Sequence, residues 1–310
     1  MAYFNPKYQE KLTLRKKIIV MYAITALYLA ASSAPALSIE TAGKISQTEA
    51  MSSEVYFRSG LSKARIKDYV GAIADFSKSL EQDNNSVSAY WARGLAKTQI
   101  GDFSGAIDDF NSVLNVSPAA ENVYYMRALA LKEMKDYTNA IEDFNRELMY
   151  NPQNENAYLN RGMCKKELGQ YEDAINDFNI VLKINPNNID AYYNRAGAKW
   201  PLEDFKGAEE DYTAVINFNK HYANAYYNRG CVRYNLSNYQ GAVQDFSIAI
   251  DLNNEDMESY FLRGLSRLFT EEFAKSIEDL EYARKLSLAK ENYKMYEGIM
   301  DFIKIVQEAQ

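Results

Sequence analysis

The sequence has few of the residues from which metal sites and small stapled folds are built. Among 310 residues it has one histidine, two cysteines and six prolines. One histidine excludes a histidine-rich metal centre, and two cysteines exclude a disulfide-stapled scaffold and a four-cysteine zinc site. So few prolines disfavour a disordered or turn-rich all-β chain. The sequence therefore predicts no metal or other cofactor.

The chain also lacks an excess of basic residues. It has 35 lysines and arginines against 42 aspartates and glutamates, for a net charge of −7. Proteins that bind nucleic acids present a basic surface to the phosphates. A nucleic-acid partner is therefore not expected.

Residues 1–36 differ in character from the rest of the chain. A basic stretch, 1–17, precedes fourteen uncharged residues, 18–31, and Ala34 and Ala36 then have the spacing of a signal-peptidase site. This order predicts a secretory signal peptide, with residues 37–52 as a linker. An uncleaved N-terminal membrane anchor is the alternative, although the apolar run is shorter than the usual span of about twenty residues. Either interpretation predicts an exported protein, periplasmic or secreted, or one held at the membrane by its N-terminus.

A period of 34 residues organises the chain from residue 53 to residue 290. Position 4 of each frame is tyrosine, positions 8 and 20 are small, and position 24 is large and apolar. Apolar residues spaced by three and four at positions 2–14 and 18–31 predict two helices in each frame. The seven frames follow one another without an insertion: 53–86, 87–120, 121–154, 155–188, 189–222, 223–256 and 257–290.

These positions resemble the tetratricopeptide repeat (TPR) family, whose pattern also has proline at position 32, here Pro118, Pro152 and Pro186. The resemblance implies an all-α fold, a right-handed superhelical solenoid of helix-turn-helix repeats. Stacked repeats leave an apolar end that needs a cover. We therefore expect residues 291–310 to form a C-terminal capping helix.

Two charged positions recur with the repeat. Position 7 is arginine in repeats 2 to 7, and position 23 is aspartate in all seven. Both lie beside the helix-packing positions, so we expect ion pairs within each repeat in preference to an anion-binding strip of arginines. Asp75, whose repeat has Ser59 at position 7, is expected to be held more loosely or to borrow Arg93.

Nothing in the sequence indicates catalysis. Nucleotide-binding, zinc-protease, redox and serine-hydrolase motifs are missing, and acidic pairs such as Asp108-Asp109 recur with the repeat. Cys164 and Cys231 lie two repeats apart, too far for a disulfide, and His221 is expected in a solvated loop. We therefore predict that the protein is not an enzyme.

The resemblance implies that positions 2, 5, 6, 9, 12 and 13 line a concave groove. An amide can donate and accept hydrogen bonds, so asparagines there can pair with any peptide backbone, and we expect them to face solvent. The alternative is that Tyr-Asn is merely a common pair at positions 5 and 6 of this family. The candidate binding residues are Asn160, Asn194 and Asn228 at position 6, and Trp91, Tyr125, Tyr193 and Tyr227 at position 5.

Repeat 5 carries Trp200-Pro201 inside its first predicted helix. Proline removes a helix donor and presses on the carbonyl four residues earlier, so the helix should end early or kink. Trp200 would then lie over a notch at Gly197 and join the candidate binding residues. A proline tolerated late in a helix is the alternative.

In repeat 7 the groove positions are apolar, with Phe261, Leu265 and Phe269 among them. Such a patch is usually covered, either by the terminal helix or by a partner or second copy of the chain. The function predicted is a non-enzymatic scaffold that binds an extended polypeptide or a partner protein in the groove. Polysaccharide binding, or a role in polysaccharide export, is the alternative.

Overall fold

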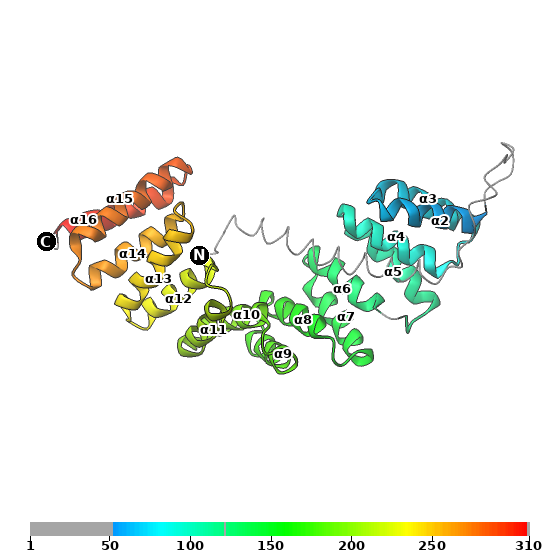
Figure 1. Ribbon diagram of the computed structural model, residues 1–310, viewed down its shortest axis with the longest axis horizontal. Coiled ribbons are helices and arrows are strands. Elements are labelled where there is room, and N and C mark those ends of the chain that lie inside the picture. Colours follow the sequence, from blue (N-terminus) through cyan, green and yellow to red (C-terminus); the bar gives the residue numbers. More distant parts are fainter. Residues whose placement is uncertain (1–51, 121, 309–310) are drawn as a thin grey trace. The chain divides into compact units, whose positions relative to one another are not determined.

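The computed structural model describes residues 52–120 and 122–308. The predicted signal peptide or anchor, and all but one residue of the predicted linker, lie outside these residues. Every regular element in the described ranges is helical, with fifteen α-helices and one short 3-10 helix, which confirms the all-α prediction (Figure 1). None of these helices is long and apolar enough to cross a membrane.

Each 34-residue frame contains one antiparallel helix pair, and the chain divides into two compact units at residues 152 and 153. The first unit contains α2 (Ser53–Arg65), α3 (Tyr69–Gln82), α4 (Val87–Ile100), α5 (Phe103–Val116), α6 (Val123–Glu133) and α7 (Tyr137–Tyr150). The second contains α8 (Glu155–Glu167), α9 (Tyr171–Ile184), α10 (Ile189–Lys199), α11 (Phe205–Phe218), α12 (Ala223–Asn235), α13 (Tyr239–Leu252), α14 (Met257–Phe269), α15 (Phe273–Ala289) and α16 (Tyr293–Glu308).

Within a repeat, a tight turn joins the two helices. Position 15 has a left-handed backbone conformation in every repeat, although glycine occupies it only at Gly101 and Gly169. Position 16 then caps the second helix, as in Asp68, whose carboxylate accepts a hydrogen bond from the Gly71 backbone at 2.9 Å. The same bond forms in four other repeats, at Asp102, Asp136, Asp204 and Asn238.

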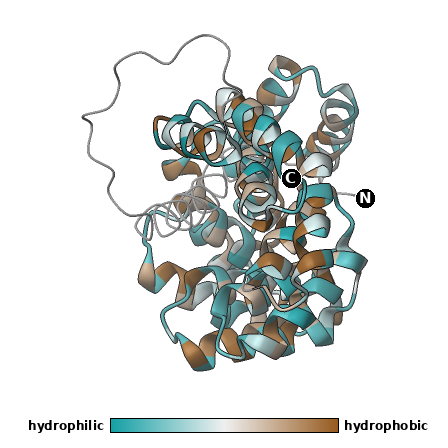
Figure 2. Cartoon of the chain, turned by 90° about the vertical axis from the view of Figure 1, so that its right-hand side faces the viewer, coloured by the Kyte–Doolittle hydropathy of each residue, from teal (hydrophilic) through white to brown (hydrophobic). Residues whose placement is uncertain are grey.

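The small residue at position 8 lets the two helices approach. A methyl group built on Gly60 would lie 2.6 Å from the Phe76 ring, and on Gly230 it would lie 2.8 Å from the Phe246 ring. These phenylalanines, at position 24, are fully buried. The core is therefore a series of similar layers, and apolar and polar segments alternate along the helices (Figure 2).

Repeat 5 and the C-terminus depart from this scheme as expected. Helix α10 ends at Lys199, and the 3-10 helix η2 (Trp200–Leu202) follows, which confirms the early end predicted at Pro201. Helix α16 packs on α14 and α15 and buries Ile299, Ile303 and Val306. Its Phe302 ring contacts Phe261 with centroids 5.4 Å apart. The terminal helix therefore covers part of the apolar patch of repeat 7.

What remains of that patch is small. Leu265 is half-buried, and Phe269 is 53% exposed. The Phe269 ring stacks on Tyr239 with centroids 4.4 Å apart. The exposed end of the patch is thus one aromatic side chain supported by the preceding repeat.

Candidate functional site

Within each of six successive repeats, an ion pair links the first helix to the second, and we call this series of pairs the ladder. In repeats 2 to 7 the arginine at position 7 donates to the aspartate at position 23, and the shortest nitrogen–oxygen distance in each pair is 2.5–2.7 Å. This confirms the predicted pairing, so the arginines do not form an anion-binding strip. The pairs are Arg93–Asp109, Arg127–Asp143, Arg161–Asp177, Arg195–Asp211, Arg229–Asp245 and Arg263–Asp279.

Each arginine of the ladder has further partners that the sequence analysis missed. In five repeats its remaining nitrogen donates to a polar residue at position 25 of the preceding repeat: Ser77, Asn111, Asn179, Thr213 and Ser247. The guanidinium also lies 5.2–5.7 Å from the ring of the position-4 tyrosine on the same helix. The signal was present in the sequence, because position 25 is almost always serine, threonine or asparagine.

A cation other than the position-7 arginine also reaches the position-23 aspartate in six of the seven repeats, and in five of these six it is a second cation beside that arginine. It comes from position 11, at 2.6–3.0 Å, and repeat 3 is the exception because Leu131 occupies that position. The residues that supply this cation are Lys63, Lys97, Lys165, Lys199, Arg233 and Arg267.

This position-11 cation corrects the prediction for Asp75. Asp75 does not borrow Arg93, but accepts hydrogen bonds from Ser59 at 2.5 Å and from Lys63 at 2.7 Å. Burial alone would raise the pKa of Asp75, and these two bonds outweigh burial and lower it. Repeat 1 is therefore held by its own lysine.

The candidate residues lie on the first helix of each repeat, at positions 2, 5, 6, 9, 12 and 13, which we call the first-helix face. The position-5 rings of Trp91, Tyr125, Tyr193 and Tyr227 each contact the position-24 ring of their own repeat, with centroids 5.4–6.0 Å apart. Tyr125 is only 5% exposed. These rings are part of the packing within the repeat, and Tyr125 offers little surface to a ligand.

The three asparagines at position 6 are not equivalent. Asn160 donates to the Asn156 carbonyl at 2.8 Å. Asn194 donates to the Asp190 carbonyl at 2.8 Å and accepts from the Lys166 ammonium at 3.0 Å. The prediction that all three side chains face solvent is wrong for Asn194, which is 6% exposed because Lys166 of the preceding repeat reaches over to it.

Asn228 is placed differently from Asn194. Its side-chain nitrogen donates to the Tyr193 hydroxyl at 3.0 Å, across the interface between repeats 5 and 6, and the residue is half-buried. Within the described part of the chain, no residue donates a hydrogen bond to its side-chain oxygen. Asn228 therefore keeps an acceptor for a ligand.

The described residues leave open space at Gly197, where the sequence predicts a notch. Among them, a methyl group built there would have one neighbour within 4 Å, the Tyr212 hydroxyl at 3.9 Å. The other repeats place a side chain at this position, namely Leu61, Leu95, Leu129, Met163, Cys231 and Leu265. Tyr212 replaces the usual phenylalanine at position 24, and its burial raises its pKa well above the ordinary value. A neutral hydroxyl therefore lies next to the notch.

Trp200 lies beside this notch. Its ring meets Phe205 edge-on at a centroid distance of 5.4 Å and packs against the cluster that contains Ala196 and Tyr212. The residue is half-buried. Trp200 thus has both a packing role and an accessible surface next to Gly197.

Neither of the two cysteines forms a disulfide, and Cys164 is fully buried. Burial raises the pKa of the Cys231 thiol to about 12. A thiol with such a pKa stays protonated near neutral pH and is a poor nucleophile. In the described ranges, no three histidine, cysteine or acidic side chains come together as a metal site.

Comparisons with known proteins agree with this geometry. Family models described as tetratricopeptide repeat match residues 121–154, 155–188 and 223–256, which are the frames of repeats 3, 4 and 6. The comparison with curated protein sequences finds no significant match.

Among solved structures, a tetratricopeptide repeat protein from Parabacteroides merdae is similar at a TM-score of 0.59 and 19% identity, covering 82% of this chain and 98% of that chain. MamA from Desulfovibrio magneticus is similar at a TM-score of 0.53 and 20% identity, covering 54% of this chain and 95% of that chain. YrrB, described as a TPR protein with an unusual peptide-binding site, is similar at a TM-score of 0.52 and 22% identity. The match covers 55% of this chain and 88% of that chain. Three frames of this chain are therefore tetratricopeptide repeats by sequence, and the structural matches show the fold that such repeats form.

Proposed function

We propose that this protein is a non-enzymatic interaction scaffold that binds an extended polypeptide on the first-helix face of repeats 5 and 6. The observation that carries the proposal is the notch at Gly197. It is the one position-9 site of the seven without a side chain, and it lies beside Tyr212 and Trp200. A side chain of the bound polypeptide fits the notch, and the Trp200 ring supplies apolar contact beside it.

Asn228 supplies the polar part of this site. Its side-chain oxygen can accept from a peptide N–H, while its nitrogen is held by the Tyr193 hydroxyl, which fixes the orientation of the amide. A hydrogen bond of this kind contributes about 1 kcal/mol net. The fold similarity to YrrB, whose description includes a peptide-binding site, supports a peptide as the ligand class. The comparisons give no support to polysaccharide binding or to self-association.

The test begins with a peptide array on the purified protein to find a ligand, followed by titration calorimetry with variants. Gly197→Leu places in repeat 5 the residue that repeats 1, 2, 3 and 7 carry at position 9. It should abolish peptide binding and leave the melting temperature unchanged or higher, because leucine favours helix over glycine. Asn228→Ala should weaken binding about fivefold, the equivalent of one lost hydrogen bond.

Leu129→Met, at position 9 of repeat 3, is the matched control and should bind as the wild type does. Unchanged affinity in both Gly197→Leu and Asn228→Ala would refute the proposed site. A glycan array run in parallel covers the alternative, since a glycan that binds wild type and not Gly197→Leu would assign the notch to a sugar.

We further propose that the protein is exported. The support is the order of basic stretch, apolar run and small residues in positions 1–36. Mass spectrometry of the protein from its native cells should find the N-terminus at or near Leu37. An intact N-terminus in the membrane fraction would indicate the anchor, and an intact N-terminus on a cytosolic protein would refute export.

A further inference from the structure

Repeat 3 lacks the position-11 cation that contacts the buried position-23 aspartate in the other six repeats. Asp143 is 3% exposed and, among the described residues, pairs with a single cation, Arg127. In the other six repeats a lysine or arginine at position 11 also contacts the equivalent aspartate. Leu131 at this position is too short and too apolar to replace it.

The groups that hold the second cation are visible in repeats 2 and 5. The Lys97 ammonium lies 2.9 Å from the Asp109 carboxylate and 3.1 Å from the Gly105 carbonyl. The Lys199 ammonium lies at the same two distances from the Asp211 carboxylate, 2.9 Å, and from the Gly207 carbonyl, 3.1 Å. These carbonyls stand at position 19, which in repeat 3 is Asn139. Repeat 3 thus keeps the aspartate and the position-19 backbone and lacks the amine.

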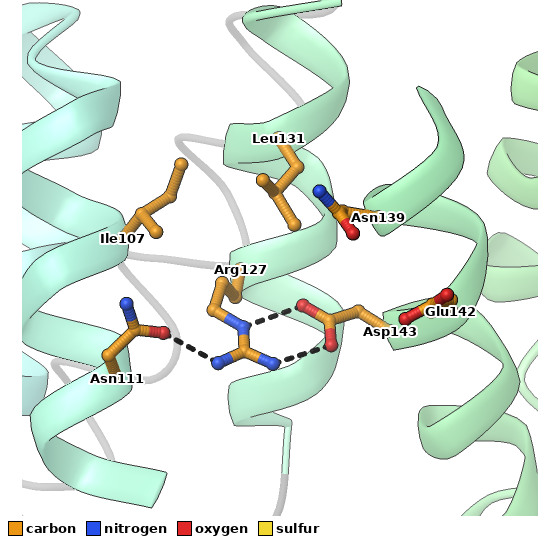
Figure 3. A pocket seen from close by; sticks show the side chains of 7 residues that line it. All are labelled: Ile107, Asn111, Arg127, Leu131, Asn139, Glu142 and Asp143. Atoms are coloured by element: carbon orange, nitrogen blue, oxygen red, sulfur yellow. Dashed lines mark hydrogen bonds and ion pairs between the residues drawn. The ribbon is translucent and has the colours of Figure 1, made fainter. Parts of the chain in front are cut away.

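A pocket of about 240 Å³ lies at this place (Figure 3). Leu131 and Ile107 form apolar walls, and Arg127 is fixed by its bonds to Asp143 and Asn111. The other lining residues are Asn139, Glu142 and Asp143 of α7.

We propose that this pocket binds the cationic side chain of a lysine or arginine presented by a partner protein. The charged group takes the position that the residue at position 11 fills in the other repeats, next to Asp143, and its methylene stem lies along Leu131 and Ile107. The exposed Glu142 adds a second carboxylate at the entrance. The nearby Arg127 does not prevent this arrangement, because the equivalent arginine accompanies the second cation in five of those repeats.

Charge favours the same occupant. Two carboxylates and one guanidinium line the pocket, so it carries a net charge of −1 that one further cation neutralises. A cation that brings an alkyl stem also covers the apolar walls, which a simple metal ion does not. The site is separate from the notch at Gly197, and each can be tested without the other.

The test uses the full chain with labelled isoleucine methyl groups, because Ile107 lines the pocket. The probe is Nα-acetyl-lysine methylamide, and its control is the norleucine analogue, which has the same stem without the ammonium. We expect a saturable chemical-shift change at Ile107 with the lysine probe and none with norleucine. A parallel titration with the arginine analogue shows which of the two cations fits better.

Leu131→Lys supplies the missing cation within the chain and should abolish the shift without lowering the melting temperature, since four other repeats carry lysine at this position. Leu131→Met, which adds no charge, is the matched control and should keep the shift. Glu142→Gln should weaken binding about three- to fivefold, as expected for a partly exposed ion pair, and this exposed position does not endanger the fold.

Three outcomes would overturn the proposal. They are no shift in the wild type, equal shifts with the lysine and norleucine probes, and a shift that persists in folded Leu131→Lys. If Leu131→Lys does not fold, the affinities of wild type and Glu142→Gln for the lysine probe are compared instead, and equal affinities refute the site.

Discussion

The two helices of each repeat meet in nearly the same way throughout the chain, whereas the first-helix face changes from repeat to repeat. Six arginine–aspartate pairs have shortest distances within 0.2 Å of one another, between 2.5 and 2.7 Å. On the first-helix face, two asparagines at the same position differ, since Asn194 accepts from Lys166 and Asn228 donates to Tyr193. Regular positions are thus architecture, and the departures at Gly197 and Leu131 mark candidate sites.

The largest expected effect comes from breaking the ladder. Asp245 is 1% exposed and pairs with Arg229 at 2.7 Å and Arg233 at 3.0 Å. Asp245→Ala leaves Arg229 without its carboxylate and Arg233 with Glu209 alone, so the free energy of unfolding should fall by about 3–5 kcal/mol. Denaturant unfolding followed by far-ultraviolet circular dichroism measures the loss.

Asp251→Ala, an exposed aspartate of the same helix, serves as the control for charge removal and should change stability by less than about 0.5 kcal/mol. Equal losses in the two variants would mean that net charge, and not the ladder, determines stability here.

Filling the glycine at position 8 should lower stability by an intermediate amount, whereas filling the glycine at position 9 should not lower it. Gly230→Val at position 8 forces a branched side chain against the Phe246 ring, which already lies 2.8 Å from a methyl group built on the glycine. Because Phe246 is fully buried, stability should fall by about 1–3 kcal/mol. Gly197→Leu at position 9 should cost nothing. Comparing the melting temperatures of the two variants checks this, and a similar loss in both would place Gly197 inside the helix packing.

Most of the fold could be predicted because the same contacts recur in most of the seven repeats. The close approach at position 8, the cap at position 16 and the Arg–Asp pair each depend on residues of a single repeat, and the structure shows all three. The early end of α10 followed from the backbone chemistry of Pro201 alone.

The contacts between neighbouring repeats were harder to predict. Burial of Asn194 depends on how far Lys166 of the preceding repeat reaches, and neither its own repeat nor its position number reveals this. The second partner of Asp75 could have been found, since position 11 is basic in six repeats. Leu131 is the single exception at position 11 among the seven repeats.

The smallest expected effect concerns the turn between the two helices, and it tests whether this turn is equivalent in all repeats. Position 15 has φ of 64° at Lys135 and 76° at Gly169, both left-handed. This conformation costs a residue with a side chain about 1–2 kcal/mol, and glycine loses about 0.5–1 kcal/mol more entropy on folding. Lys135→Gly should therefore raise stability by up to about 1 kcal/mol, and Gly169→Ala should lower it by a similar amount. Denaturant midpoints measured at equal slope check both. If the turn is interchangeable between repeats, Lys67→Gly should give the same gain as Lys135→Gly, whereas a loss in either would show that the lysine side chain contributes contacts of its own.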